Sequence, residues 1–187
     1  MVADKEEEYF DVVDENNVVT GKQRRSEVHR LGLLHRAVYC FVFNPAGELL
    51  IQRRSLKKRI GAGKWDLSCA EHLQPGESYR EGAQRGLQEE LDIRKTISAG
   101  PLSPTHLREH KEGFCFVDRE FVESYRVDNY VGSFRCDPEE VEEAKFISLI
   151  ELKQAVEQHP EEYTPWFLDE IRLLDWFGAV EAVDDQQ

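Results

Sequence analysis

The sequence predicts an α/β sandwich built on a mixed sheet. Short β-prone runs precede a strongly helical stretch at residues 79–91, and more strand-like sequence follows it before the chain ends in helical segments. The helical stretch opens with a capping box, in which Ser78 is followed three residues later by Glu81. It then continues with Ala, Gln, Leu and Glu, which are good helix formers. This order of elements is typical of a sheet with helices packed on its faces.

The remaining elements are predicted from β-branched and aromatic runs and from turn residues. Residues 9–14 and 18–22 flank Glu-Asn-Asn and predict a hairpin, and residues 23–30 are expected to be helical or irregular. Residues 100–112 contain two prolines and are expected to end in a charged loop. A helix is predicted from Ser148 to about Gln158, and another starts at Thr164-Pro165, with Pro at its first position. Strands are predicted at 35–43, 49–53, 65–70, 114–130 (one bent strand or two) and 144–148.

Length and composition predict one domain over residues 1–187, with a core at about 29–180 and an N-terminal hairpin and lead-in at 1–28. The chain is 40% apolar and 33% charged, a normal composition for a globular protein. Its net charge of −13 argues against binding nucleic acid, which requires a basic face. We therefore expect a small-molecule partner and no nucleic acid, with the protein a monomer or a homodimer.

The N-terminus, Met-Val-Ala-Asp-Lys-Glu-Glu-Glu, contains no apolar segment of the secretory type, and no apolar run reaches membrane-spanning length. Four cysteines occur without a Cys-x-x-Cys pair, which favours reduced thiols. We expect a cytoplasmic protein without membrane association, or an organellar one if a transit peptide has been removed.

The helical stretch carries a candidate metal site. Glu89 and Glu90 are adjacent at its end, and Glu77 lies in the loop before it. Mg²⁺ is bound by oxygen ligands and retains several waters, so two or three carboxylates suffice, and Mn²⁺ is the alternative ion. The other interpretation is a solvated helix laced by ion pairs, since Glu81, Arg85 and Glu89 form a row of alternating charge.

Residues 77–93 resemble the Nudix box, a loop–helix–loop motif. The positions that match are Glu77, Arg85, Leu87, Glu89, Glu90 and Ile93. Glu71, Gly86 and Asp92 depart from the pattern, which has Gly, Glu and Gly there. The resemblance implies the Nudix fold and metal-dependent chemistry on a diphosphate. Because the Glu expected at position 86 is a ligand in the family, the variant Gly86→Glu is expected to supply a missing carboxylate.

A basic cluster precedes the box and contrasts with the acidic composition. Arg and Lys both suit phosphate, Arg as a planar fork and Lys as a compact charge. The cluster therefore predicts diphosphate binding, and the alternative is a solvated basic loop. Its members are Arg53, Arg54, Lys57, Lys58, Arg59 and Lys64.

Beyond the box, residues 29–177 resemble the type I isopentenyl-diphosphate isomerases. The residues that carry this resemblance are His35-Arg36-Ala37, Arg53 to Lys58, Gly63, Trp65, Ser68, His72, Gly76-Glu77-Ser78, Asp118-Arg119-Glu120 and Thr164-Pro165-Trp166.

This resemblance implies a role for individual residues. His35 and His72 would be metal ligands, with His29 one residue short of the spacing for a third. Arg54 and Lys58 would contact phosphate. Glu120 would be the acid/base group, and Trp166 would cover the reacting carbon. The place of the family's catalytic Cys falls on Ala70. Cys69 is one residue earlier, on the opposite face of the predicted strand.

Three functions stay open on these grounds. The first is a metal-dependent hydrolase of a nucleoside or isoprenoid diphosphate, with Glu77, Glu89 and Glu90 holding the ion and Glu120 as candidate base. The second is an isopentenyl-diphosphate isomerase, for which the Cys is missing. The third is a module that binds a diphosphate without turning it over.

Overall fold

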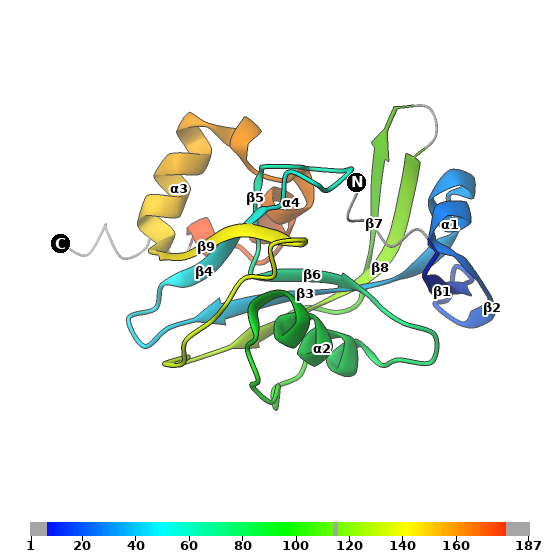
Figure 1. Cartoon of the computed structure of the whole chain (residues 1–187), viewed down its shortest axis with the longest axis horizontal. Helices are drawn as coiled ribbons and strands as arrows, with labels where there is room; N and C mark the ends of the chain where they lie inside the picture. Colours follow the sequence, from blue (N-terminus) through cyan, green and yellow to red (C-terminus); the bar gives the residue numbers. More distant parts are fainter. Residues whose placement is uncertain (1–6, 114–115, 179–187) are drawn as a thin grey trace.

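The computed structural model describes residues 7–113 and 116–178, which form a mixed sheet between helices (Figure 1). The strands are β1 Tyr9–Val13, β2 Val19–Arg24, β3 Leu34–Phe43, β4 Leu49–Arg54, β5 Trp65–Asp66, β6 Cys69–His72, β7 His106–Glu112, β8 Phe116–Val127 and β9 Val141–Ile147. The helices are α1 Arg25–Leu31, α2 Tyr79–Leu91, α3 Leu149–Gln158 and α4 Pro165–Leu173, with a 3-10 turn at Pro160–Glu162.

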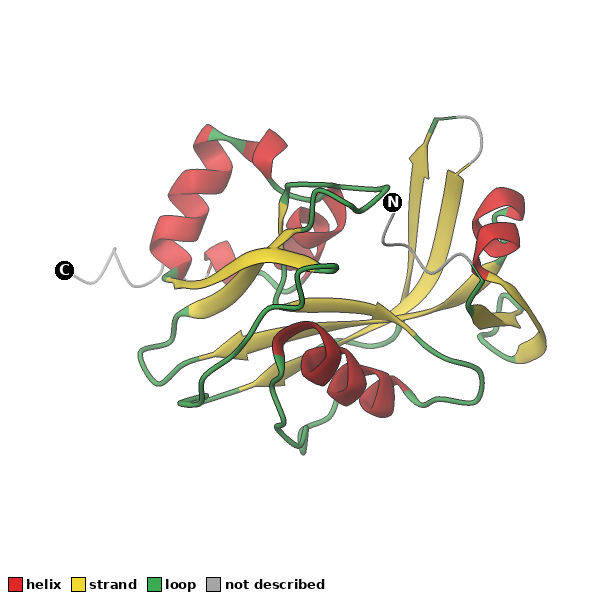
Figure 2. Cartoon of the chain, in the orientation of Figure 1, coloured by secondary structure: helices red, strands yellow, loops and turns green. Residues whose placement is uncertain are grey.

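The larger sheet has seven described strands, and β3 lies at its centre. It pairs in parallel with β8 on one side and antiparallel with β4 and β6 on the other. β7 and β9 extend the sheet beyond β8 and β4. The predicted mixed sheet is confirmed, with helices on both of its sides (Figure 2).

The centre of the sheet is buried on both faces, which explains why β3 is apolar almost throughout. Its odd-numbered side chains from Ala37 to Phe43 pack in one core with Leu152 of α3 and Phe167 of α4. Its even-numbered side chains, such as Val38 and Cys40, pack in a second core with α2. This period of two follows from strand geometry. The two cores make the α/β/α sandwich that the sequence predicts.

Helix α2 has the bounds predicted from its local signals. Ser78 accepts a hydrogen bond from the backbone N–H of Glu81, and the Glu81 side chain accepts one from the Ser78 backbone in return. The helix ends at Asp92, whose left-handed backbone (φ 53°) is tolerated by Asp and favoured by Gly. That conformation explains why the Nudix pattern has Gly there. The capping box predicted at Ser148 is also present.

Two predicted elements are wrong. The loop expected at 100–112 contains a regular strand, β7, which pairs with β8 along its whole length. The single strand expected at 65–70 is divided into β5 and β6, which pair with different neighbours, β4 and β3. The predicted tail at 184–187 lies outside the described residues.

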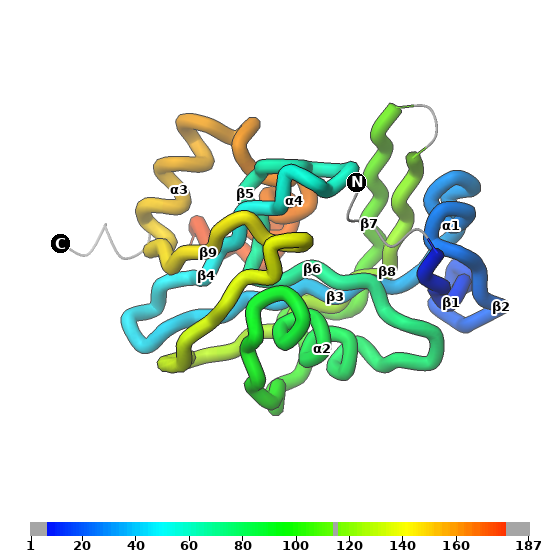
Figure 3. The backbone as a smooth tube through the Cα atoms, viewed as in Figure 1, coloured from blue at the N-terminus to red at the C-terminus, as the bar shows by residue number. Residues whose placement is uncertain are grey.

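The predicted N-terminal hairpin, β1 and β2, is confirmed as a separate two-stranded sheet. Together with α1 it lies at the opposite end of the molecule from α3 (Figure 3). It is attached to the box region by hydrogen bonds from the Gly76 backbone N–H to Asp11 (2.8 Å) and from Asn17 to the Tyr79 hydroxyl (3.1 Å). Among the described residues, no helix is long and apolar enough to cross a membrane.

Candidate functional site

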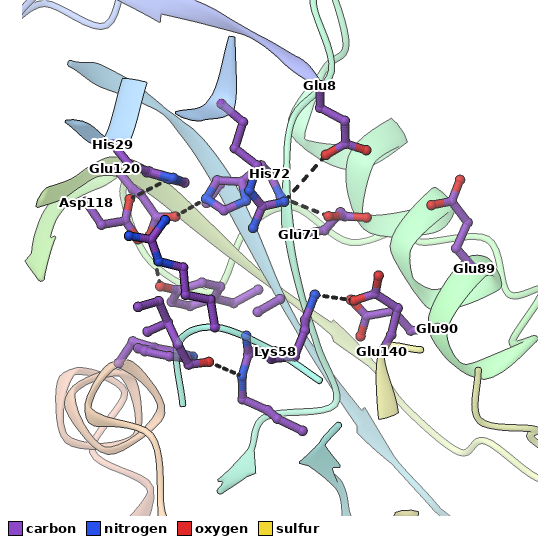
Figure 4. Close-up of a pocket in the computed structure, with 18 of the residues that line it drawn as sticks. Glu8, His29, Lys58, Glu71, His72, Glu89, Glu90, Asp118, Glu120 and Glu140 are labelled. Atoms are coloured by element: carbon purple, nitrogen blue, oxygen red, sulfur yellow. Dashed lines mark hydrogen bonds and ion pairs between the residues drawn. The ribbon is translucent and has the colours of Figure 1, made fainter. Parts of the chain in front are cut away.

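A cleft of about 480 Å³ opens between the hairpin end of the molecule, the centre of the sheet, α2 and α4. That volume is in the range of small-molecule sites. Figure 4 shows that charged side chains occupy two parts of it. His29, His72, Asp118 and Glu120 gather on one side, whereas Glu89 and Glu90 extend from α2 on the other.

The register of three strands assembles the first group. His35 on β3 lies opposite Glu120 on the parallel strand β8, and His72 on β6 lies opposite Ala37 on β3. Asp118 is two residues before Glu120, so the two share a face of β8. His29 comes from α1. Side chains from four elements therefore meet at one point, although no two of these elements adjoin in the chain except α1 and β3.

The nitrogen and oxygen atoms of this group face one another at short distances. One nitrogen or oxygen atom from each of His29, His35, His72 and Asp118 lies within 4.8 Å of all the others. The Nε2 atoms of the three histidines and Oδ1 of Asp118 are buried, and His35 Nε2 lies 3.2 Å from Asp118 Oδ1. A neutral imidazole whose lone pair faces a carboxylate oxygen makes no hydrogen bond to it. His72 Nε2 is also 2.9 Å from Glu120 Oε1. Buried polar atoms are normally satisfied, so this cluster is suited to a bound cation.

Two of the histidines have shifted pKa values, and the two shifts run in opposite directions. Burial, reinforced by the neighbouring His72, lowers the pKa of His29 to about 3, which keeps it neutral. The Nδ1 atom of His35 is 3.0 Å from the Leu33 carbonyl, which favours the tautomer with its lone pair on Nε2. Burial opposes a charge on His35, but Asp118 and Glu120 outweigh burial and raise its pKa. Phe10 of the hairpin covers the rings of His35 and His72, with centroids 5.4 and 4.6 Å away.

The carboxylates of the group are held ionised by cations. Burial alone would raise the pKa of Glu120, but Arg108 and His72 outweigh it and hold that pKa well below its usual range. Arg108 also donates to Asp118 Oδ2 at 3.2 Å. An ionised carboxylate is a good cation ligand. The same low pKa makes Glu120 a weak proton acceptor, which bears on its predicted role as a base.

Three imidazoles with one or two carboxylates suit a divalent transition ion. Imidazole is a ligand for Zn²⁺, Fe²⁺ and Mn²⁺, whereas Mg²⁺ prefers oxygen ligands. Of the two predicted ions, Mn²⁺ therefore fits this group better than Mg²⁺.

The predicted carboxylate site on α2 is not assembled in the same way. Both oxygens of Glu77 accept hydrogen bonds from Arg85, at 2.9 and 3.0 Å, and Glu77 does not line the cleft. Glu89 lies 3.3 Å from Arg85 and is half-exposed at the cleft edge. Glu90 is buried in the cleft wall and accepts a hydrogen bond from Gln52 at 2.8 Å. Burial, with Glu71 and Glu140 nearby, raises the pKa of Glu90 to about 8.

Gly86 is not an open position in the metal face. A Cβ at this position would lie 2.7 Å from Cys69 Sγ and 3.1 Å from the Glu71 Cβ, so α2 packs directly on β6 here. The expectation that Gly86→Glu supplies a ligand is therefore wrong, because the side chain has no room. Cys69 is fully buried in the α2 core, and Ala70 is the residue that lines the cleft.

The predicted phosphate contacts both line the cleft. Arg54 donates to Asp66 at 3.1 Å and to the Ile60 carbonyl at 3.2 Å, and its guanidinium lies 5.2 Å from the Trp166 ring centroid. Trp166 Nε1 donates to the same carboxylate at 2.9 Å. Lys58 forms an ion pair with Glu140. The buried Asp66 thereby fixes Arg54 and Trp166 relative to each other.

Much of the basic cluster is compensated by acidic residues around the start of β9. Arg53 pairs with Glu143 and Lys57 with Glu139, in addition to the pair of Lys58. β4 and β9 are hydrogen-bonded neighbours, which places these charges side by side. The exposed pairs Arg53–Glu143 and Lys57–Glu139 contribute little stability. The local excess of positive charge read from the sequence is therefore smaller in the folded protein.

The match to a known family agrees with this architecture. Residues 33–167 match the NUDIX domain, which is most of the chain. The chain belongs to the Nudix family.

Several curated relatives of this Nudix protein are isopentenyl-diphosphate Delta-isomerases. One from Pectobacterium atrosepticum is 31% identical over 91% of this chain and 94% of its own length. An uncharacterised Nudix hydrolase from Pseudomonas aeruginosa is 38% identical over 72% of this chain and 75% of its own length. Both reaction classes therefore occur among the named relatives.

Solved structures support the fold of this Nudix protein. A MutT protein from Methanosarcina mazei aligns with a TM-score of 0.59 and 26% identity, covering 76% of this chain and 93% of that one. A protein from Deinococcus radiodurans aligns with a TM-score of 0.58 and 23% identity over 81% and 90% of the two chains.

Sequence reasoning missed three residues of the site in this Nudix protein. Asp118 had a usable signal, since Asp-x-Glu on a strand puts two carboxylates on one face. His29 was set aside for a spacing one residue short, yet it reaches the cluster from α1, outside the matched domain. Arg108 lies on β7, which was predicted as a loop.

Proposed function

We propose that this protein is a metal-dependent hydrolase of a small-molecule diphosphate, of the nucleoside or isoprenoid kind. The observation that carries the proposal is the identity of the side chain at Ala70. Strand alternation on β6 directs Ala70 to the cleft and Cys69 into the core. The isomerase chemistry implied by resemblance needs a thiol at this place, and no cysteine lies among the described residues that line the cleft.

His29, His35, His72 and Asp118, with Glu120 beside them, would hold the divalent ion. A bound ion of this kind neutralises phosphoryl oxygens and lowers the pKa of coordinated water. The residues contribute by keeping the His29 imidazole neutral and the Glu120 carboxylate ionised, as their pKa shifts indicate.

Other cleft residues supply the remaining requirements of hydrolysis. Arg54 and Lys58 offer donors to the diphosphate, with Trp166 as an apolar wall. The oxygen of water bonds to one phosphorus while the bridging P–O bond breaks, which leaves a phosphate group on each product. The proton that water loses in this step passes to a base. Glu90 is suited to accept it in its ionised form, whose population rises as pH approaches its pKa of about 8. Glu89, at the cleft edge, would assist in binding a cation that accompanies the phosphates.

Isopentenyl-diphosphate isomerisation is the second candidate. It is favoured by relatives that are isomerases over about 90% of this chain and by the presence of Glu120 and Trp166 in one cleft. Binding of a diphosphate without turnover is the third.

The three candidates differ in their products. We would incubate the protein with Mn²⁺ or Mg²⁺ and either a panel of nucleoside and sugar diphosphates or isopentenyl diphosphate, and follow ³¹P resonances. Phosphate or a monophosphate is the expected product, and its loss in Asp118→Asn would assign it to this cleft. Dimethylallyl diphosphate formed without phosphate release would establish the isomerase instead.

A further inference from the structure

Arg108 lines the cleft beside the histidine group, next to Asp118 and Glu120. It lies opposite Glu120 in the β7–β8 register, and its side chain is only 11% exposed. It forms an ion pair with Glu120 and donates to Asp118 at 3.2 Å. These bonds hold the guanidinium in one place against the cleft wall.

The bonds of Arg108 leave part of its hydrogen-bonding capacity unused. Nε and Nη2 donate to the two carboxylates. Nη1 has no hydrogen-bond partner among the described residues, although Arg108 lines the cleft. Arginine is a fixed fork of five N–H groups. The cleft therefore presents donors that are already positioned and available to an oxygen atom of a ligand.

Arg108 also covers the aromatic walls of the cleft. Its guanidinium lies 5.5 Å from the Trp166 ring centroid and 5.9 Å from that of Tyr39. These distances are typical of cation–π contact. A hydrocarbon tail that approached either ring would have to lie against this cation. Such a tail has no hydrogen-bond acceptor to offer to Nη1.

We infer that Arg108 determines specificity, by selecting a substrate whose group beyond the diphosphate carries oxygen acceptors, such as the ribose of a nucleoside or sugar diphosphate. This inference rests on the proposed function and narrows its substrate class. A site built to hydrogen-bond a polar group discriminates strongly against analogues that lack it, because its buried donors are then left unpaired. A prenyl chain is such an analogue.

The test compares two ligands in one protein, so that the fraction of folded protein cancels. ADP-ribose represents the polar class and dimethylallyl diphosphate the apolar class. We would measure kcat/KM for both with Mn²⁺, and Kd by calorimetry for their methylene-bridged, non-hydrolysable analogues. Arg108→Met keeps the length of the side chain and removes its donors, whereas Arg108→Lys keeps the charge without the planar fork.

Arg119→Met is the matched control. Arg119 is also an arginine of the β7–β8 pair, but it pairs with Glu109 at 2.6 Å and does not line the cleft. In wild type and Arg119→Met we expect kcat/KM for ADP-ribose to exceed kcat/KM for dimethylallyl diphosphate by at least about tenfold. In Arg108→Met the ratio of these two kcat/KM values should fall by about tenfold or more, and the ratio in Arg108→Lys should lie between those of wild type and Arg108→Met.

Two results overturn the inference: a wild-type preference for the prenyl compound, or a ratio that Arg108→Met leaves unchanged while the variant keeps its wild-type melting temperature. Failure to bind either analogue contradicts it as well. The proposed function can fail separately. Selective binding of the polar analogue without hydrolysis of either substrate would contradict the hydrolase function and support the specificity role of Arg108. Hydrolysis of both substrates at similar kcat/KM would support the hydrolase function and contradict the role of Arg108.

Discussion

Asp118 and Glu77 are carboxylates of similar burial, with side chains 10% and 12% exposed, and they belong to different candidate metal sites. Asp118 faces three imidazole nitrogens, whereas Glu77 is held by Arg85. We expect Asp118→Asn to weaken Mn²⁺ binding by at least about tenfold, an effect of the size seen when groups around a metal centre are altered. Glu77→Gln makes the same change of charge and should leave binding nearly unchanged. Calorimetric titration with Mn²⁺ compares the affinities of the two variants. A larger loss of affinity in Glu77→Gln than in Asp118→Asn would show that the metal binds at the Nudix box instead.

The buried carboxyl of Glu90 gives a prediction at the same scale. Its pKa is about 8 in the folded protein, raised mainly by burial, against 4.5 for an ordinary Glu. Between these values the native state binds more protons than the unfolded state, so the free energy of unfolding falls as pH rises from about 5 to 8.

The control variant Glu90→Gln lacks this proton and can still pair with Gln52. Denaturant unfolding in EDTA should show the variant gaining stability relative to wild type as pH rises, with a slope of at most about 1.4 kcal/mol per pH unit. A difference that is constant from pH 5 to 8 would mean that Glu90 is not a buried acid.

At the scale of elements, the contact between α2 and β6 depends on Gly86. Alanine is the better helix former by about 1 kcal/mol, so propensity alone predicts that Gly86→Ala stabilises the protein. Its Cβ would instead meet Cys69 Sγ at 2.7 Å, and overpacking of this kind costs about 1–3 kcal/mol. We expect a lower melting temperature. In a double-mutant cycle, Cys69→Ala should recover part of the loss by removing the sulfur. Additive effects of the two changes would show that the sulfur is not the obstacle.

The same elements show what the sequence could reveal. The bounds of α2 were predictable because its capping box and helix formers act within one segment. The bounds of β7 were not predictable, since Leu107 is its one apolar residue and it contains no β-branched residue. Pairing with β8 decides its conformation. The histidine group was only half visible, because its members meet through the register of strands distant in the chain. Resemblance supplied His35 and His72, and geometry added His29 and Asp118.

For the whole molecule, the candidate metal group joins parts that the Nudix match separates. His29 and the covering Phe10 precede residue 33, whereas the other candidate ligands lie within the matched domain. A ligand that binds only the folded state stabilises it by mass action. Saturating Mn²⁺ should therefore raise the melting temperature of EDTA-treated protein, and His29→Ala should reduce that rise. An equal rise in both proteins would show that the hairpin end takes no part in binding.

Hydrolysis is the central claim, and the fate of the water oxygen tests it most directly. The protein would be incubated with Mn²⁺ and a diphosphate substrate in H₂¹⁸O, and the products analysed by mass spectrometry. Hydrolysis predicts one ¹⁸O atom in one of the two phosphate-bearing products for each molecule cleaved. An isomerase would convert isopentenyl diphosphate into dimethylallyl diphosphate with the diphosphate group intact and free of ¹⁸O, and in D₂O it would place deuterium on carbon. Carbon deuteration without ¹⁸O in any phosphate would contradict the account.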